Sequence, residues 1–172
     1  MTMDRGFVHL YWGDGKGKTT AAMGLALRAL GSGLSVTIVQ FLKSGTSGEL
    51  TPLRRLGAVI YAGKVGTAFS GGLTAEEKIA TRALQTAHLR QALATDCDLL
   101  ILDEACVAWQ LDLVDRDLLQ AAVLQRPARR EVVLTGRLPA PWMEEAADYA
   151  TQLCCRRHPY SQGIQARGGI EF

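Results

Sequence analysis

Gly13-Asp14-Gly15-Lys16-Gly17-Lys18-Thr19-Thr20 lies between a short apolar segment, residues 7–11, and an alanine-rich segment, residues 20–30. Its glycines let the backbone curl so that several N–H groups face one anion, and a helix over residues 20–30 would point its N-terminus at the same anion. Lys18 can add a positive charge, and Thr19 can offer a hydroxyl to a magnesium ion. This stretch therefore predicts a strand, a phosphate-binding loop and a helix, in that order.

The glycine spacing is a variant of the usual phosphate-loop pattern. That pattern places a glycine where this chain has Trp12, and Gly13 stands one residue closer to the lysine. A glycine-rich turn without a ligand is the alternative interpretation. The Gly-Lys-Thr triplet at a strand-to-helix turn is specific enough to favour a bound triphosphate.

Strand and helix patterns alternate along the rest of the chain. Strands are expected at residues 7–11, 35–40, 58–61, 98–102 and 131–135, the last clear one. Helices are expected at residues 20–30, shortly after residue 48, and over residues 74–94, 115–124 and 141–147. This order predicts an α/β fold with a mostly parallel sheet and helices on both faces. Residues 1–172 are expected to form a single domain, since no linker or repeat interrupts them.

The composition is that of an ordinary globular protein, with 48% hydrophobic and 21% charged residues and a net charge of +2. Such a weak overall charge argues against nucleic acid or a membrane surface as a partner. No apolar run approaches the roughly 20 residues that span a bilayer, and the N-terminus shows no signal-peptide pattern. We therefore expect a cytoplasmic protein.

The cysteines predict neither a zinc site nor a disulfide framework. Cys97 and Cys106 flank an apolar run, where cysteine usually behaves as a small buried hydrophobe. Cys154 and Cys155 are adjacent, and the chain has no Cys-x-x-Cys pair.

An acidic pair follows the buried strand expected at 98–102. Asp103 and Glu104 come directly after Leu99-Leu100-Ile101-Leu102, at the strand end where open α/β sheets bind ligands. Either carboxylate could hold magnesium, directly or through water, from a strand next to that of the phosphate loop. The alternative is that both acids only favour the start of a helix. Arg137 follows the end of another strand, and its guanidinium could donate two hydrogen bonds to phosphate oxygens.

Three stretches together resemble the corrinoid adenosyltransferases, which transfer an adenosyl group from ATP to cob(I)alamin. The first is residues 13–22, continuing to Val39-Gln40-Phe41-Leu42-Lys43. The second is Leu102-Asp103-Glu104 with Leu134-Thr135-Gly136-Arg137. The third is the C-terminal segment from His158 to Phe172, which generic phosphate-loop enzymes do not share.

The resemblance implies a RecA-like P-loop fold with a C-terminal signature segment at 156–172, and a homodimer. It implies that the Co(I) corrinoid attacks the 5′ carbon of ATP and that the whole triphosphate leaves. It also implies that the corrinoid binds first as Co(II), with a flavoprotein as the electron donor. Whether the substrate is complete cobalamin or a precursor such as cobyrinic acid a,c-diamide stays open.

The residue roles that the resemblance and the chemistry suggest fall into three groups. The leaving group is a polyanion, so catalysis needs neutralisation of charge, which is assigned to Lys18, Arg137 and Glu104. Binding of ATP is assigned to Gly13, Asp14, Gly15, Lys16, Gly17, Lys18, Thr19, Thr20, Lys43 and Arg137. Magnesium is assigned to Thr19, Asp103 and Glu104.

The glycine-bearing loop at residues 62–73 departs from the family pattern. Phe69 is kept as the residue that closes on the corrin, but Gly71 stands where relatives have a tryptophan. A glycine cannot fill the volume of a tryptophan. The hypothesis is that this loop closes less firmly on the corrin, or that Tyr61 or Trp109 takes the place of the missing tryptophan.

The histidines are not expected to act as ligands. His9 is expected to be a packed residue of the first strand, and His88 a solvated residue of a helix. His158 is expected to support the structure near the active site.

Two other functions stay open. A P-loop ATPase or small-molecule kinase, in which Glu104 activates water or an acceptor hydroxyl, would explain the loop and the acids and would release ADP. A carrier that binds nucleotide or corrinoid without turnover is the non-enzymatic alternative.

Overall fold

Six strands form one parallel sheet in the order β3-β2-β4-β5-β1-β6 in the computed structural model, which describes residues 4–65 and 72–171. The strands are β1 Val8–Trp12, β2 Val36–Gln40, β3 Val59–Ala62, β4 Leu99–Asp103, β5 Glu131–Gly136 and β6 Tyr149–Gln152. The helices are α1 Lys18–Gly31, α2 Leu50–Arg55, α3 Ala75–Ala94, α4 Ala105–Gln110, α5 Arg116–Leu124 and α6 Pro141–Ala146. A 3-10 turn, η2 Pro159–Gln162, lies in the C-terminal segment. The predicted parallel α/β fold is confirmed.

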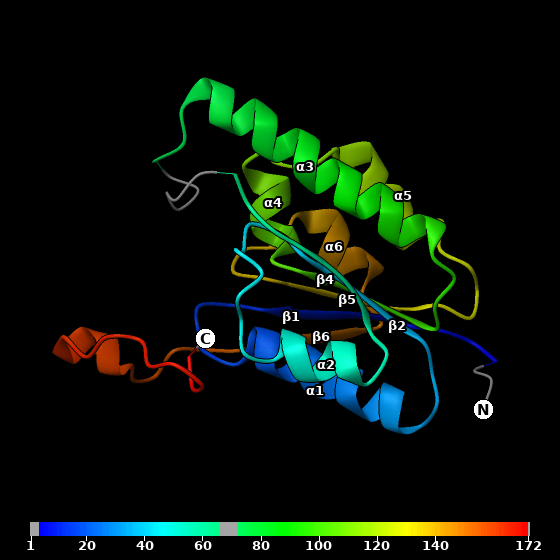
Figure 1. The fold of residues 1–172 in the computed structure, drawn as a ribbon, viewed down its shortest axis with the longest axis horizontal. Coiled ribbons are helices and arrows are strands. Elements are labelled where there is room, and N and C mark those ends of the chain that lie inside the picture. The colour runs from blue at the N-terminus through cyan, green and yellow to red at the C-terminus, as the bar shows by residue number, and fades with distance from the viewer. Residues whose placement is uncertain (1–3, 66–71, 172) are drawn as a thin grey trace.

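Helices cover both faces of the sheet, and each face has its own core. Figure 1 shows α1 and α2 on one face and α3, α4, α5 and α6 on the other. Every residue of β2 and β4 is buried, as is typical of parallel strands that are covered on both faces. One core joins α1 to the sheet through residues such as Ala26 and Ile38, and the other joins α3 and α5 through Leu89 and Leu119.

Helix starts follow from side chains that cap them. Thr74 accepts a hydrogen bond from the Glu77 backbone, and the Glu77 carboxylate accepts one from the Thr74 backbone, so α3 begins with a capping box. Asp115 accepts from the Leu118 backbone at 3.0 Å and caps α5 in the same way. Both helix starts agree with the sequence-based prediction.

Two elements and one strand position were not predicted. Strand β6 is short and exposed at every position, so it has no apolar alternation to reveal it. Helix α4 is only six residues long. Strand β5 lies between β1 and β4, so the acidic strand is not next to the phosphate-loop strand, and the prediction of neighbouring strands was wrong.

The cysteines are all free; Cys97 and Cys106 are buried and Cys154 and Cys155 are exposed. This confirms the expectation for the buried pair. Among the helices of the described residues, none combines the length and apolarity that crossing a membrane needs.

Candidate functional site

The phosphate loop connects β1 to α1 and is closed by its own lysine. Gly17, at a φ of 115°, is the residue before the helix, and its left-handed backbone lets the chain turn into α1. The Lys18 ammonium donates to the carbonyl oxygens of Gly13 and Gly15, each at 2.8 Å. The Lys18 ammonium is thus held inside the curved loop, at the position where a bound phosphate would contact it.

The chain that follows β6 holds the loop from outside. The Gly15 N–H donates to the Leu153 carbonyl at 2.8 Å, and the Cys155 N–H donates to the Asp14 carboxylate at 3.0 Å. A Cβ on Gly13 would lie 2.3 Å from the Leu153 carbonyl oxygen, and one on Gly15 would lie 2.8 Å from it. These glycines are therefore required by close packing against Leu153, a residue that the sequence analysis missed.

We expect Gly15→Ala to weaken ATP binding by about 10- to 100-fold, because the new methyl group displaces the loop from Leu153 at a typical overpacking cost of about 1–3 kcal/mol. Calorimetric titration of magnesium and ATP measures this. Gly24→Ala is the matched control: it lies within α1 with no atom within 4 Å of the added Cβ. It should leave ATP affinity unchanged and raise stability by about 0.5–1 kcal/mol. Equal affinities for both variants would contradict the role assigned to Leu153.

Asp103, at the end of β4, is fully buried and accepts hydrogen bonds at both carboxylate oxygens. Its Oδ1 accepts from the hydroxyls of Thr19 at 2.9 Å and Thr135 at 2.7 Å. Its Oδ2 accepts from the Lys43 ammonium at 2.6 Å and the Gln40 amide at 3.3 Å. The carboxylate thus joins the phosphate loop to β2 and β5, and the contributions of Thr135 and Gln40 were not predicted.

Glu104 follows Asp103 in a left-handed backbone conformation, with a φ of 61°. Such a conformation is costly for a residue other than glycine and is common at functional sites. The Glu104 N–H donates to the Thr135 hydroxyl at 2.9 Å, so one threonine holds both acidic residues. Next to it, Gly136 is required by close packing, because a Cβ there would lie 2.3 Å from the Cys106 Cβ on α4.

The charged side chains at the carboxyl edge of the sheet shift one another's pKa values. Burial raises the pKa of Glu104, and the Asp103 charge adds to this, while Lys43, Lys18 and Arg137 oppose it. Burial lowers the pKa of the Lys18 ammonium; Glu104 opposes this and Arg137 adds to it. The mutual effects place Lys18, Glu104 and Arg137 within electrostatic reach of one another.

The structure brings together most of the residues that the sequence suggested. Hydrogen bonds join Thr19, Lys43 and Asp103 to one another, and Glu104 directly follows Asp103. Lys18 lies in the same loop as Thr19 but bonds to loop carbonyls. The side chains of Asp14, Lys16, Thr20 and Arg137 are exposed around them. Phe69 and Gly71 lie outside the described residues.

The two suggested substitutes for the clamp tryptophan both pack against other side chains. The Tyr61 ring lies 6.2 Å from the His88 ring, and its hydroxyl is 3.4 Å from that of Thr95. The Trp109 ring packs edge-on against Trp142, with centroids 5.0 Å apart. Their substitution for the tryptophan stays a hypothesis.

The histidines belong to the framework. His9 is mostly buried; its Nε2 lies 2.5 Å from Glu131, and its ring stacks on Tyr149 at 4.6 Å, as expected of a packed residue. His158 Nδ1 accepts from the Tyr160 N–H at 3.2 Å within the C-terminal segment. His88 is half-buried rather than solvated, because its face of α3 packs on Tyr61, and the prediction for it was wrong.

We expect His88 to make the protein less stable as the pH falls from about 7.5 to 5.5. Burial lowers the pKa of His88 in the folded protein, whereas in the unfolded chain it is about 6.5. The unfolded state therefore binds the proton first, and the free energy of unfolding decreases as the pH falls through this range. Urea unfolding at several pH values should show a flatter decline for His88→Leu; an unchanged decline would contradict this.

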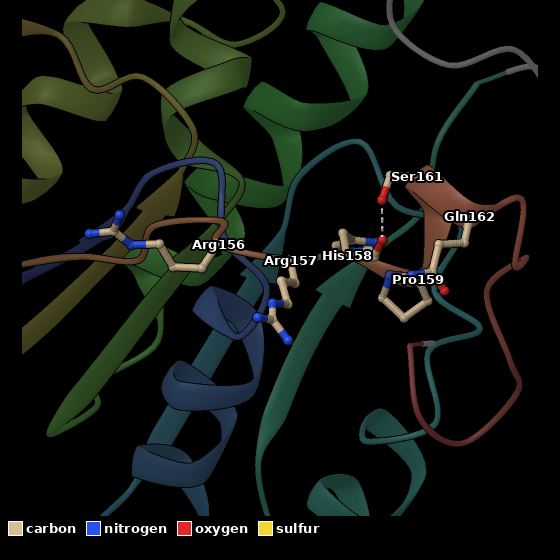
Figure 2. Close-up of a pocket in the computed structure, with 6 residues that line it drawn as sticks. All are labelled: Arg156, Arg157, His158, Pro159, Ser161 and Gln162. Atoms are coloured by element: carbon tan, nitrogen blue, oxygen red, sulfur yellow. Dashed lines mark hydrogen bonds between the residues drawn. The ribbon is translucent and has the colours of Figure 1, made fainter.

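The C-terminal segment carries a hollow of about 320 Å³, lined by Arg156, Arg157, His158, Pro159, Ser161 and Gln162. Figure 2 shows Arg156 and Arg157 extending away from the His158–Ser161 part of the hollow. Figure 1 shows this segment projecting beyond the sheet. Its apolar side chains Tyr160, Ile164 and Ile170 are 69%, 49% and 59% exposed, so it lacks a core of its own.

Comparison with known sequences gives one consistent result. The profile of the family described as ATP:corrinoid adenosyltransferase BtuR/CobO/CobP matches residues 4–172. A corrinoid adenosyltransferase of Pseudomonas aeruginosa is 34% identical, over 98% of this chain and 85% of that protein. Proteins of the same description from Escherichia coli K12 and Salmonella typhimurium are 31% and 30% identical, each over 98% of this chain and 87% of the relative.

Solved structures give only weak matches. The Xyl-CE4 domain of a xylanase from a Trinervitermes trinervoides hindgut metagenome aligns over 98% of this chain and 96% of its own, with 13% identity and a TM-score of 0.30. The peptidoglycan deacetylase PdaC of Bacillus subtilis aligns over 86% and 88%, with 9% identity and a TM-score of 0.29. Similarity at this level carries no argument about fold or function.

Proposed function

The chain belongs to the ATP:corrinoid adenosyltransferase family, a family of enzymes that adenosylate corrinoids with ATP, and we propose that its carboxyl-edge site carries out this transfer. The observation that carries the proposal is the contact between Thr19 of the phosphate loop and the buried Asp103. It joins the triphosphate loop to a buried acid, as an ATP site that uses a metal requires. Residues 1–172 act as one domain in this proposal, since the site residues that the structure describes lie at one edge of a single sheet.

We infer that the site accelerates departure of the triphosphate by neutralising its charge. The reduced corrinoid cobalt supplies the electron pair that forms the bond to the 5′ carbon of ATP, and the carbon–oxygen bond to the triphosphate breaks. No protein nucleophile is then needed. Lys18 and Arg137, with the amides of residues 13–20, would face the leaving oxygens, where charge develops in the transition state.

A magnesium ion fits the oxygen groups at this edge. Thr19, Asp103 and Glu104 offer a hydroxyl and two carboxylates, which are oxygen ligands of the kind magnesium prefers. Within residues 4–65 and 72–171 no cluster of three or more His, Cys, Asp or Glu side chains could hold a metal by itself. This suits magnesium, which usually takes one or two carboxylates and completes its shell with phosphates and water. When bound, it would neutralise charge on the triphosphate.

Other partners are proposed from the family resemblance. A flavoprotein would supply the electron that reduces Co(II) to Co(I), and Phe69 would contact the corrin. A homodimer would cover exposed apolar side chains such as Tyr160 and Ile170, which light scattering of the purified protein can test. Use of ATP and a strong reductant favours a cytoplasmic location.

The test is anaerobic incubation with magnesium, ATP and chemically reduced cob(I)alamin. Adenosylcobalamin, followed by its light-sensitive absorbance, should form together with inorganic triphosphate. Formation of ADP without corrinoid would instead indicate the ATPase or kinase. Tight ATP binding without any product, also with cob(I)yrinic acid a,c-diamide, would indicate a carrier.

A further inference from the structure

Lys43 stands where a divalent cation would be expected. Its ammonium lies 2.6 Å from Asp103 Oδ2 and 3.0 Å from the Thr19 hydroxyl oxygen. Both residues belong to the proposed magnesium set. In the structure, then, an amine cation already bridges the two oxygen groups that the metal would use.

The backbone around Lys43 is held by the chain next to it, whereas its side chain is long and partly exposed. Leu42, two residues after the end of β2, has a left-handed φ of 60° and so turns the chain just before Lys43. The Gly63 N–H donates to the Lys43 carbonyl at 3.1 Å and holds the turn. The side chain is 26% exposed and its four-carbon stem is flexible, so the ammonium can change partners while the backbone stays in place.

Lys43 and a metal cannot occupy this position together. Magnesium lies about 2.0–2.1 Å from its ligand oxygens, so an ion on the Thr19 hydroxyl would lie beside an ammonium that is 3.0 Å from the same oxygen. Repulsion between the two cations opposes joint occupancy. Yet without any cation the fully buried Asp103 carboxylate would be left without a charge partner, which is strongly unfavourable.

We propose that Lys43 is a placeholder for the divalent cation. Its ammonium holds Asp103 and Thr19 in the metal-free protein and leaves this position for the phosphate oxygens when magnesium and ATP enter. The site is thereby arranged before the nucleotide arrives, and metal alone binds weakly. This inference rests on the proposed function, since it takes Thr19 and Asp103 as the magnesium residues.

The first test measures the binding of Mn²⁺ alone to the nucleotide-free protein. The EPR signal of the free ion gives the fraction that is not bound. Lys43→Met should bind Mn²⁺ at least about fivefold more tightly than the wild type, because removal of the ammonium leaves the acidic site uncompensated. Lys43→Arg keeps the charge and should bind as the wild type does. Lys78→Met removes the same charge from an exposed position of α3 and should change the affinity less than twofold. Unchanged or weaker binding by Lys43→Met would overturn the proposal.

The second test needs no loss of the lysine charge and so holds even if Lys43→Met fails to fold. NMR of ¹⁵N-labelled lysine side chains should show a protected Lys43 ammonium, assigned from its absence in Lys43→Arg. Adding magnesium and ATP should change the ¹⁵N chemical shift of this ammonium, because phosphate oxygens replace Asp103 and Thr19 as its partners, and an unchanged shift would overturn the proposal. Neither test contains a corrinoid, so a failure of adenosyl transfer would bear on the proposed function separately.

Discussion

Lys18→Met should lower kcat/KM for adenosyl transfer by about 10²–10³-fold, the usual effect of removing one group that stabilises developing negative charge. Lys18 is the cation inside the curl of the loop, held by the carbonyl oxygens of Gly13 and Gly15. The triphosphate gains charge as its bond to the 5′ carbon breaks, so most of the effect should fall on kcat.

Initial rates of adenosylcobalamin formation at varied ATP measure this effect. Lys78→Met is the matched control, because it removes the same charge from an exposed position of α3. Its rates should equal those of the wild type. If Lys18→Met changed kcat/KM by less than about tenfold, the charge assigned to Lys18 would have to come from another group, with Arg137 the first candidate.

Asp103→Ala should lower the free energy of unfolding by about 1–3 kcal/mol, the range typical of leaving buried hydrogen-bonding groups without their partner. The substitution leaves the Lys43 ammonium without its carboxylate partner. It also removes the acceptor for the hydroxyls of Thr19 and Thr135. The phosphate loop, β2 and β5 would lose their common anchor at the same time.

Urea unfolding at neutral pH measures this loss, and Asp112→Asn is the control, because asparagine tolerates the left-handed backbone of Asp112 and removes only its charge. Asp112 is 56% exposed and lies 3.6 Å from both Arg82 and Arg116, so its ion pairs should contribute less than about 1 kcal/mol. A similar small loss for Asp103→Ala would show that the buried network does not hold the fold.

The fold could be predicted wherever it depends on residues that are close to one another in the sequence. The alternation of apolar and helical segments predicted the parallel sheet, and Thr74 with Glu77 predicted the start of α3. Strand β6 was missed because it is an edge strand that pairs with β1, and its exposed residues carry no apolar pattern. The place of β5 between β1 and β4 is likewise a long-range property.

The sequence predicted most of the residues of the candidate site, but not the hydrogen bonds that join them. Lys18 and Thr19 were found from spacing, and Asp103 from its place after an apolar run. The hydroxyl of Thr135 joins both acids, yet threonine at a strand end is too common to point to this role. Leu153 was missed because its part is played by a backbone carbonyl, which any residue would supply.

The attachment of the loop to the chain beyond β6 has a consequence for biosynthesis. Asp14 and Cys155, which share a hydrogen bond, are 141 residues apart, so Asp14 is made well before Cys155 during translation. A nascent chain without its last segment has the glycine-rich loop but lacks the carbonyl and amide that hold it. The loop is therefore held from outside only after Leu153 and Cys155 have been made and have packed against it, so its final shape forms late in the folding of the chain.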